Sequence, residues 1–432
     1  MLGSVPAFAE IDEAAAIALD ECDPLPSLRD EFAVPPATGG SYPEIAYFAG
    51  NSLGLMHQSV PLAIERELGE WRTLAVEAWF EAGEPWLELA GSLRRSIGTL
   101  VGARDDEVVV MSSLTVNLHL LLTSFYRPSG ERTRMLIEES CFPSDSHAAI
   151  TQVRARGLDP ARELVHVAPG SDRTMGTAEI VDAIERHGDR LALVLLAGVN
   201  YLTGEALDLD AITAAGHRVG ATVGWDLAHG IGNVPLSLHG SGADFAVWCH
   251  YKYVNGGPGA PGGAFVHERH GRDPERLRLG GWWAVDPAVR FKMEPAFEPR
   301  PGAEGWAVST PSIIALAPLR AALEPFDRVG IVALRERSLR LTGALERMVA
   351  DVACGRRAQL ITPTATARRG AQLSLAVVDA GAKAEAMRTR HGVICDVREP
   401  DVLRFAPAPL YNTNHDCWRA AAALHDVLEE TS

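Results

Sequence analysis

The sequence predicts an α/β protein with a large domain on a mainly parallel sheet, followed by a smaller α+β domain. From about residue 60, short apolar runs such as "EVVVMSS" and "LALVLLAGV" alternate with segments of helical spacing such as "SVPLAIERELGEWRTLAVEAWF". Continuous apolar strands separated by helices are typical of a parallel sheet that is covered on both faces. After about residue 310 a long helical stretch leads into "AQLSLAVV" and "GVICDVREPDVLRFAPA". The last run predicts two strands joined by a turn at Glu399 and Pro400.

The expected elements of the large domain follow one another in strand–helix order. The expected strands are residues 107–113, 134–140, 191–199, 221–226 and 243–253. The expected helices are residues 59–80, 114–126, 144–157 and 208–220. We expect residues 51–308 to form the large domain and residues 309–432 the small one. Residues 1–50 do not follow the alternation, so we expect them to pack with the small domain.

Composition excludes several classes of function. The chain has 432 residues and a formal net charge of −16, which argues against nucleic acid as a partner. No apolar run approaches the roughly 18–20 residues that span a bilayer, and the N-terminal segment is acidic where a signal peptide would be basic. We therefore expect a cytoplasmic protein with no membrane partner. The six cysteines form no CxxC pair and no group with histidines, which predicts free thiols and no metal site.

Two of the expected strands end in candidate binding residues. The run "VVVMSSLTVNLHLLL" passes from a strand through Ser112, Ser113 and Thr115 into a helix, where hydroxyls and backbone N–H groups could hold a phosphate. The alternative is simple N-capping of that helix by Ser113. In "IEESCFPSDSHAA", Phe142 precedes a proline in a strand-to-helix loop. It could cover a planar ligand, or it could be a core aromatic beside a turn.

Two later strands end in ionisable residues. Asp226 ends an apolar strand in "TVGWDLAHGIG", and His229 follows it. A buried carboxylate needs a partner, which could be a protonated heterocyclic nitrogen, a metal or a helix N-terminus, and no third ligand at the usual spacing favours a metal. The alternatives are a helix cap for Asp226 and a satisfied buried histidine for His229. Lys252, in "CHYKYVNGGPGAPGG", precedes a glycine-rich loop. A desolvated lysine suits Schiff-base chemistry, whereas the alternative is a surface lysine at a strand end.

One cofactor explains all four strand ends together. Pyridoxal 5′-phosphate has a phosphate, a flat ring, a ring nitrogen that pairs with a carboxylate, and an aldehyde that reacts with a lysine. In a parallel sheet, ligands bind at the carboxyl ends of the strands, where these residues are expected. The sequence therefore predicts a pyridoxal phosphate site.

The ordered set of motifs resembles kynureninase, a homodimeric family of the fold-type-I pyridoxal-phosphate class, whose large domain has a seven-stranded sheet. The resemblance covers residues 45–416, and the motifs that carry it are "YFAGNSLGL", "LTVNLHLLL", "FPSD", "GVNYLTGE", "DLAHGIGNV", "WCHYKYVNGGPG", "GGW", "RFKM" and "LRFAPAPLYNT". It implies hydrolysis of L-kynurenine to anthranilate and L-alanine by cleavage of the Cβ–Cγ bond.

The resemblance also implies roles for individual residues. Lys252 would bind the cofactor covalently, Asp226 would pair with its ring nitrogen, and Tyr251 would transfer protons. The further cofactor-binding residues that it implies are Leu114, Thr115, Phe142, Ser144, Asp145, His229, Trp282 and Thr310. The substrate-binding residues that it implies are Arg404, Asn51, Ser52 and Trp79, with Arg404 holding the substrate carboxylate through its guanidinium fork.

Two features depart from the family or vary within it. Ala197 stands where relatives often carry a hydroxyl residue near the cofactor. Trp79 and Phe80 lie near the position that shapes the aryl pocket, which varies in the family, so a 3-hydroxylated or otherwise substituted kynurenine is an open alternative.

Two other functions are alternatives. A cysteine desulfurase or selenocysteine lyase would share the fold and the lysine, with Cys354 as the nearest candidate for a catalytic cysteine. A non-catalytic protein that has kept the fold is the other alternative, although Lys252 and Asp226 would be costly to bury without the cofactor.

Overall fold

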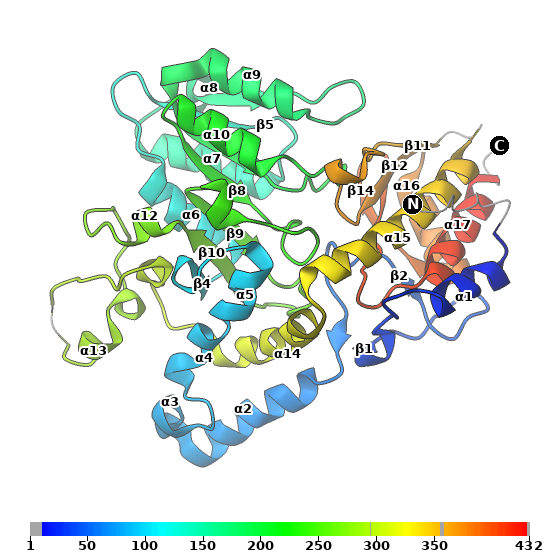
Figure 1. The fold of residues 1–432 in the computed structure, drawn as a ribbon, viewed down its shortest axis with the longest axis horizontal. Helices are drawn as coiled ribbons and strands as arrows, with labels where there is room; N and C mark the ends of the chain where they lie inside the picture. Colours follow the sequence, from blue (N-terminus) through cyan, green and yellow to red (C-terminus); the bar gives the residue numbers. More distant parts are fainter. Residues whose placement is uncertain (1–10, 294, 355–357, 430–432) are drawn as a thin grey trace.

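The computed structural model describes residues 11–293, 295–354 and 358–429, and it has two lobes linked by a long helix (Figure 1). The larger lobe is built on a seven-stranded sheet in the order β4-β10-β9-β8-β7-β5-β6. Its strands are β4 (Val108–Met111), β5 (Arg134–Glu138), β6 (Leu164–Val167), β7 (Leu191–Ala197), β8 (Thr222–Asp226), β9 (Phe245–Cys249) and β10 (Gly262–Val266). Only β10 is antiparallel to its neighbours, so the prediction of an α/β fold with a mainly parallel sheet is confirmed.

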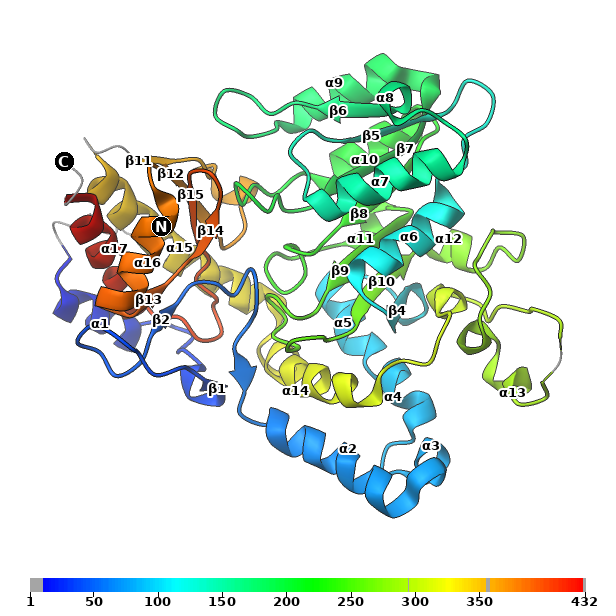
Figure 2. The same ribbon diagram turned by 180° about the vertical axis from the view of Figure 1, so that it is seen from behind.

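The sheet is buried on both faces. Along β4, Val108 and Val110 belong to one apolar core, whereas Val109 and Met111 belong to the other. Helices α9 (Thr177–His187) and α10 (Leu209–Arg218) cover the first face. Helices α6 (Leu114–Phe125) and α7 (Pro143–Ala155) cover the second, which faces the viewer in Figure 2. Most side chains of the inner strands therefore enter a core, which explains the uninterrupted apolar runs.

The sequence did not predict two strands, β6 and β10. β6 is an edge strand with an exposed histidine, so it lacks a continuous apolar run. β10 begins with Gly262 and Gly263, residues that are rare in strands. A Cβ atom on Gly263 would lie 2.3 Å from the indole nitrogen of Trp248, so glycine is required where this side chain crosses the neighbouring strand.

The remaining helices of the large lobe surround the edges of the sheet. The expected helix 59–80 ends at Leu74, passes through Ala75 at a φ of 50°, and resumes three residues later. The longer of these helices are α2 (Val60–Leu74), α4 (Trp86–Ser92), α5 (Arg94–Val101) and α14 (Ile313–Val329). The four-residue helices are α3 (Ala78–Glu81), α8 (Pro160–Glu163), α11 (Leu238–Ser241), α12 (Glu268–Gly271) and α13 (Pro287–Arg290).

The small lobe is an antiparallel sheet covered by helices. Its strands, in the order β11-β12-β15-β14, are β11 (Ala358–Leu360), β12 (Leu373–Val377), β15 (Val402–Phe405) and β14 (Asp396–Arg398). Its helices are α15 (Ile331–Ala353), α16 (Ala380–His391) and α17 (Asn414–Glu429). The turn expected at Glu399 and Pro400 joins β14 to β15, as predicted.

The N-terminal segment lies against the small lobe over much of its length. Helix α1 (Glu13–Glu21) packs on α17, and β2 (Ala46–Tyr47) pairs in parallel with β13 (Val393–Ile394). Two further short strands of this part of the chain, β1 (Phe32–Ala33) and β3 (Met56–His57), pair with each other, and α2 of the large lobe follows β3. Residues 1–10 of the expected segment lie outside the described residues.

The contacts of α14 bear on the expected junction at residue 309. This helix packs against α2, α4 and α5, and Ile313, Leu316 and Phe326 lie in the core of the large lobe. Within α15, Leu334 still belongs to the large-lobe core, and Leu341 is the first residue in the small-lobe core. We therefore place the junction near Gly330, because helical spacing reveals an apolar face but not which sheet covers it. No helix within the described residues is long and apolar enough to cross a membrane.

Candidate active site

A pocket lies at the carboxyl ends of the central parallel strands. Each strand end contributes side chains because parallel strands finish at one edge of the sheet. The lining residues are Leu114, Thr115, Phe142, Ser144, Asp145, Ala197, Val199, Tyr201, Asp226, Ala228, His229, Tyr251 and Lys252. The fold thus gathers most of the sequence-predicted cofactor residues in one cavity.

One end of the pocket is an anion cradle. Leu114 begins α6 and Ser144 lies in the first turn of α7, so two helix N-termini border the cavity. The Thr115 and Ser144 hydroxyl oxygens lie 2.6 Å apart. The Ser113 side chain makes no capping hydrogen bond, so the simple capping alternative is wrong. Two hydroxyls and uncapped N–H groups match the needs of a phosphate.

The middle of the pocket is lined by an aromatic ring and the lysine. Phe142 is 43% exposed, so it is not a core aromatic. The Nζ atom of Lys252 lies 5.9 Å from the centre of its ring, and Tyr201 packs edge-on against it at 5.3 Å. Lys252 is half-buried in the turn after β9 rather than extended on the surface. A flat ligand held between Phe142 and the sheet edge would therefore lie within reach of the lysine amine.

Three buried carboxyl groups, those of Asp226, Asp145 and Glu138, lie close to one another at this end of the strands. Asp226 is 6% exposed, and one of its oxygens accepts a 2.7 Å hydrogen bond from Ala228 N. Burial, then the charge of Asp226, raise the pKa of the adjacent Asp145 well above its usual range, and one Asp145 oxygen has no hydrogen-bond partner. Glu138 accepts hydrogen bonds from Ala197 N at 2.6 Å and from Asn200 Nδ2 at 2.8 Å. Asp226 thus serves partly as a turn cap, but its local hydrogen bond satisfies only one oxygen.

His229 and Tyr251 complete the wall of the cavity. His229 is 5% exposed, and its Nδ1 makes no hydrogen bond among the described residues, so the satisfied-histidine alternative is wrong. Burial, and then the charge of Lys252, hold the pKa of His229 well below its usual value, so the ring is neutral. Burial, then the neighbouring Cys249, raise the pKa of Tyr251. Tyr251 therefore keeps its proton at neutral pH and can act as a donor.

Arg404 lies on the small-lobe side of the cavity and is fully buried. Its Nη1 donates to Tyr201 O at 2.5 Å, and its Nη2 donates to Asp396 Oδ2 at 2.5 Å and to Ser52 Oγ at 3.2 Å. Arg398 pairs with the other Asp396 oxygen at 2.7 Å. The Nε–H group of Arg404 has no partner among the described residues. The two lobes and the N-terminal segment therefore meet at this guanidinium.

Six predicted site residues do not line the pocket of this chain: Arg404 and Ser52, which meet beside it, and Asn51, Trp79, Trp282 and Thr310. Asn51 is buried and donates to Gln372 Oε1 at 2.8 Å, close to the Arg404 group. Trp79 packs against other tryptophans, and Trp282 is 45% exposed on a separate loop. Thr310 is exposed. A single chain thus leaves Trp79, Trp282 and Thr310 outside the cavity.

Tyr201, Glu138, Asp396 and Arg398 belong to the site, although the sequence did not predict them. Tyr201 lies in the quoted motif "GVNYLTGE", so an aromatic residue after a strand end was an available signal. Asp396 and Arg398 alternate on one strand two residues apart, beside the strand of Arg404. Glu138 ends a buried strand exactly as Asp226 does, and this pattern could have identified it.

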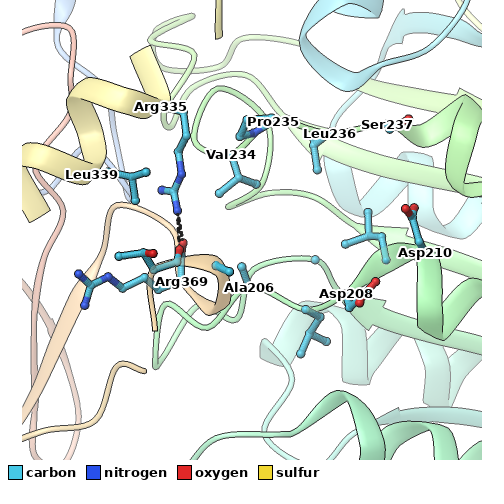
Figure 3. A pocket seen from close by; sticks show the side chains of 15 residues that line it. Ala206, Asp208, Asp210, Val234, Pro235, Leu236, Ser237, Arg335, Leu339 and Arg369 are labelled. Carbon is cyan, nitrogen blue, oxygen red and sulfur yellow. Dashed lines mark hydrogen bonds between the residues drawn. The ribbon is translucent and has the colours of Figure 1, made fainter. Parts of the chain in front are cut away.

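A second cavity lies between the lobes, and it contains none of the predicted site residues (Figure 3). Arg335 on α15 points into it and donates to Arg369 O at 2.6 Å, and Leu236 and Asp208 lie on the large-lobe side. Asp208 and Asp210 line it, but it has no lysine to bind a pyridoxal aldehyde. The strand-end pocket is therefore the cofactor candidate.

The side chains that line the strand-end pocket match the chemical groups of pyridoxal phosphate. The unpartnered Nδ1 of His229 and oxygen of Asp145 are buried polar atoms, which normally have hydrogen-bond partners. The cradle, the aromatic cover, the lysine and the carboxylate match the phosphate, ring, aldehyde and ring nitrogen of that molecule one by one. No other group in the sequence analysis uses all four.

The chain has the fold of pyridoxal-phosphate-dependent enzymes of fold type I. A C-DES variant with glycine covalently linked to the PLP cofactor has a TM-score of 0.75 at 17% identity, over 88% of this chain and 96% of that one. An apo cysteine desulfurase from Thermococcus onnurineus NA1 has a TM-score of 0.74 at 14% identity, over 89% and 95% of the two chains. These distant likenesses show the fold alone.

The chain belongs to the kynureninase family. Kynureninase from Salinispora tropica is 53% identical to it over 97% of this chain and 98% of the relative. Kynureninases from Stenotrophomonas maltophilia and Koribacter versatilis are 50% and 48% identical, over 96% and 94% of this chain and 96% of each relative. The family model "Kynureninase C-terminal domain" matches residues 334–424. The expected family is confirmed, and the desulfurases are similar only in fold.

We expect Glu138 to make the protein less stable as pH rises. Burial raises the pKa of Glu138 from 4.5 to about 7. Because the folded protein then binds this proton more tightly than the unfolded chain, stability should fall between about pH 4.5 and 7, by roughly 2–4 kcal/mol. Urea unfolding of the wild type and Glu138→Gln at pH 5 and pH 8 measures this. Glu138→Gln should change the free energy of unfolding by a similar amount for reasons of packing at both pH values, but it should remove the part of the pH dependence that is due to Glu138. An equal change in the free energy of unfolding between pH 5 and pH 8 in the two proteins would contradict the prediction.

Proposed function

We propose that this protein catalyses the pyridoxal-phosphate-dependent hydrolysis of L-kynurenine to anthranilate and L-alanine. The observation that carries the proposal is the meeting of Lys252, Asp226 and Phe142 in one pocket with Arg404 at its small-lobe side. Family membership at about half identity over nearly the whole chain supports the same reaction.

In this proposal the large lobe holds the cofactor. Leu114, Thr115 and Ser144 hold the phosphate through hydroxyl and backbone N–H groups. Phe142 covers the ring, and Asp226 keeps a proton on the ring nitrogen. Pyridoxal phosphate, when bound, supplies an electron sink for carbanions formed on the substrate. Asp145 and His229, which contribute buried atoms without partners, complete the polar contacts beneath it.

Two residues would move protons. The Lys252 amine would remove the proton from the substrate Cα. The Tyr251 hydroxyl, whose pKa is raised by burial, donates a proton where the Cβ–Cγ bond breaks. Water adds to the γ-carbonyl carbon, so that carbon leaves as the carboxyl group of the aryl acid, and the protonated Cβ becomes the methyl group of alanine.

The small lobe and the N-terminal segment would hold the substrate. Arg404 binds the α-carboxylate through its unpartnered Nε–H and an adjacent N–H, while Asp396 and Tyr201 fix its plane. A guanidinium held on one side by protein acceptors presents a fixed fork on the other. Ser52 and Asn51 lie on the same side of the site and would contact the substrate's polar atoms.

The proposed reaction leaves open which substituent the aromatic ring of the substrate carries. Trp79 is proposed to border the aryl site, in an aromatic group with Trp86 and Trp283. Pure protein incubated separately with kynurenine and 3-hydroxykynurenine, followed by detection of the aryl acid and alanine, measures the preference. Release of neither acid would leave the non-catalytic alternative standing, and release of sulfide or selenide from cysteine or selenocysteine would favour the lyase alternative.

Asp226→Asn should leave the cofactor bound but abolish most turnover. An amide cannot stabilise a protonated ring nitrogen, whereas the covalent link to Lys252 is untouched. Borohydride reduction followed by peptide mapping should place the phosphopyridoxyl group on Lys252 in both the wild type and the variant. Near-normal turnover of Asp226→Asn, or label on another lysine, would show that the proposed assignment is wrong.

Arg404→Lys should lower kcat/KM at least tenfold while cofactor affinity survives. A charged hydrogen bond contributes about 1.5–3 kcal/mol, and about 1.4 kcal/mol is a factor of ten. Lysine keeps the charge but not the fork. Arg398→Lys, which changes the other arginine paired with Asp396, is the matched control and should have the smaller effect. Lost cofactor affinity with intact kcat/KM would place Arg404 at the phosphate instead.

We also propose a cytoplasmic homodimer in which Trp282 and Thr310 serve the partner's site. Helices α2 and α3 and residues 277–293 and 295–297 present an apolar surface on which Phe80 and Trp282 both pack against Phe291. The exposed apolar residues on these segments are Leu62, Leu68, Trp71, Val76, Phe80, Leu277, Leu279, Trp282, Phe291, Met293 and Phe297. A surface of this kind marks a protein interface, and Trp282 and Thr310 are exposed rather than in their own pocket.

Phe291→Glu should therefore shift the protein from dimer to monomer. Phe291 is 52% exposed, and Val378, on the small lobe, is 54% exposed. Val378→Glu is thus a control of equal exposure that should stay dimeric. Light scattering coupled to gel filtration measures both masses. A monomeric wild type, or a dimer unaffected by Phe291→Glu, would contradict the proposed interface.

A further inference from the structure

A second group of metal-ligating side chains lies away from the strand-end pocket. Glu107 precedes β4, His239 lies on α11, and His267 follows β10. The three are far apart in sequence, which is why no spacing motif predicted them. Their ligand atoms, one carboxylate oxygen and the two Nδ1 atoms, all lie within 4.8 Å of one another.

The distances are close to those of a tetrahedral metal site. Nδ1 of His239 lies 2.9 Å from Glu107 Oε1, and Nδ1 of His267 lies 3.7 Å from the same oxygen. Zinc–nitrogen and zinc–oxygen bonds of about 2.1 Å place neighbouring tetrahedral ligands roughly 3.4 Å apart. The two imidazole rings are stacked with centroids 5.1 Å apart, and both would rotate to direct their nitrogens at one ion.

The charge of the group also calls for a cation. Glu107 is fully buried, yet within residues 11–293, 295–354 and 358–429 no lysine or arginine forms an ion pair with it. Its carboxylate accepts hydrogen bonds from the backbone N–H groups of Arg104, at 3.0 Å, and Glu268, at 2.8 Å. A buried carboxylate is stabilised by an opposite charge, and its only ion-pairing partners here are the two imidazoles.

His267 shows which nitrogen is free to bind. Its Nδ1 accepts a long hydrogen bond of 3.3 Å from Arg269 N, so this nitrogen carries a lone pair and no proton. Two acceptors, this nitrogen and Glu107 Oε1, then face each other at 3.7 Å. A cation between them would turn that repulsion into two bonds, at the cost of one weak hydrogen bond.

We propose that Glu107, His239 and His267 form a binding site for a zinc-class divalent transition-metal ion. Two imidazole nitrogens and one carboxylate oxygen are a common zinc ligand set, and the partial exposure of His239 leaves room for water at a fourth position. This proposal differs from the sequence analysis, which predicted no metal site.

The position of the site defines its effect. Glu107 lies at the amino end of β4, whereas the cofactor pocket begins beyond the carboxyl end of that strand. Four strand residues, about 13 Å, separate the two. The ion would join the start of β4, the end of β10 and helix α11, so it should stabilise the sheet edge without entering the reaction.

Zinc titration of the chelator-treated, desalted holoenzyme by calorimetry tests the proposal. We expect about one zinc per chain to bind and the melting temperature to rise with zinc. His239→Gln keeps a hydrogen-bond donor for Glu107, and His267→Asn keeps an N-cap acceptor, so both variants should fold. Each should weaken zinc binding at least about tenfold, with unchanged turnover without added metal.

His166→Gln, which changes an exposed histidine outside the group, is the matched control and should bind zinc as the wild type does. No saturable binding to the wild type would overturn the proposal. Binding that survives equally in His239→Gln and His267→Asn would overturn it too, because the zinc would then be held elsewhere.

Discussion

The burial of the large sheet on both faces is the constraint on which the rest of the structure depends. Val108 and Val110 enter one core while Val109 and Met111 enter the other, so neither face of the sheet is open to solvent along the inner strands. Polar chemistry is therefore confined to the strand ends. Because all strands except β10 run the same way, Thr115, Asp226 and Lys252 finish at one edge and share one pocket.

The same confinement produces an unusual density of buried carboxyl groups. Glu138, Asp145 and Asp226 lie close enough that the charge of Asp226 raises the pKa of both of its neighbours, in addition to burial. A cationic ring nitrogen beside Asp226 would relieve this repulsion. The cofactor in the proposed function thus stabilises the site that binds it.

Buried arginines that donate to backbone carbonyl groups connect segments that are far apart in the sequence. Arg337 donates to Leu25 O at 2.8 Å and to Asn412 O at 2.9 Å, which ties the N-terminal segment to the C-terminal part of the chain. Arg404 similarly reaches from β15 to Tyr201 in the large lobe. A substrate carboxylate at Arg404 would act on this junction, so binding and the relative placement of the lobes are coupled in the proposed function.

The sequence by itself determined the class of fold and the cofactor pocket. Uninterrupted apolar runs that alternate with helical segments indicate strands buried on both faces, and residues directly after parallel strands lie at one edge of the sheet. Local pattern also located the turn at Glu399 and Pro400. It missed β10, because glycines are required there by a tryptophan on the neighbouring strand, which is a contact between residues 248 and 263 rather than a propensity.

Only the tertiary structure decided which partners meet across long stretches of chain. It joined α14 to the large lobe, placed Asp396 and Ser52 on Arg404, and left Trp282 and Thr310 outside their own pocket. It also brought Glu107 to two histidines more than a hundred residues away in sequence. The physical reason is that periodicity reports how one segment is buried, whereas contacts between segments depend on how whole elements pack together.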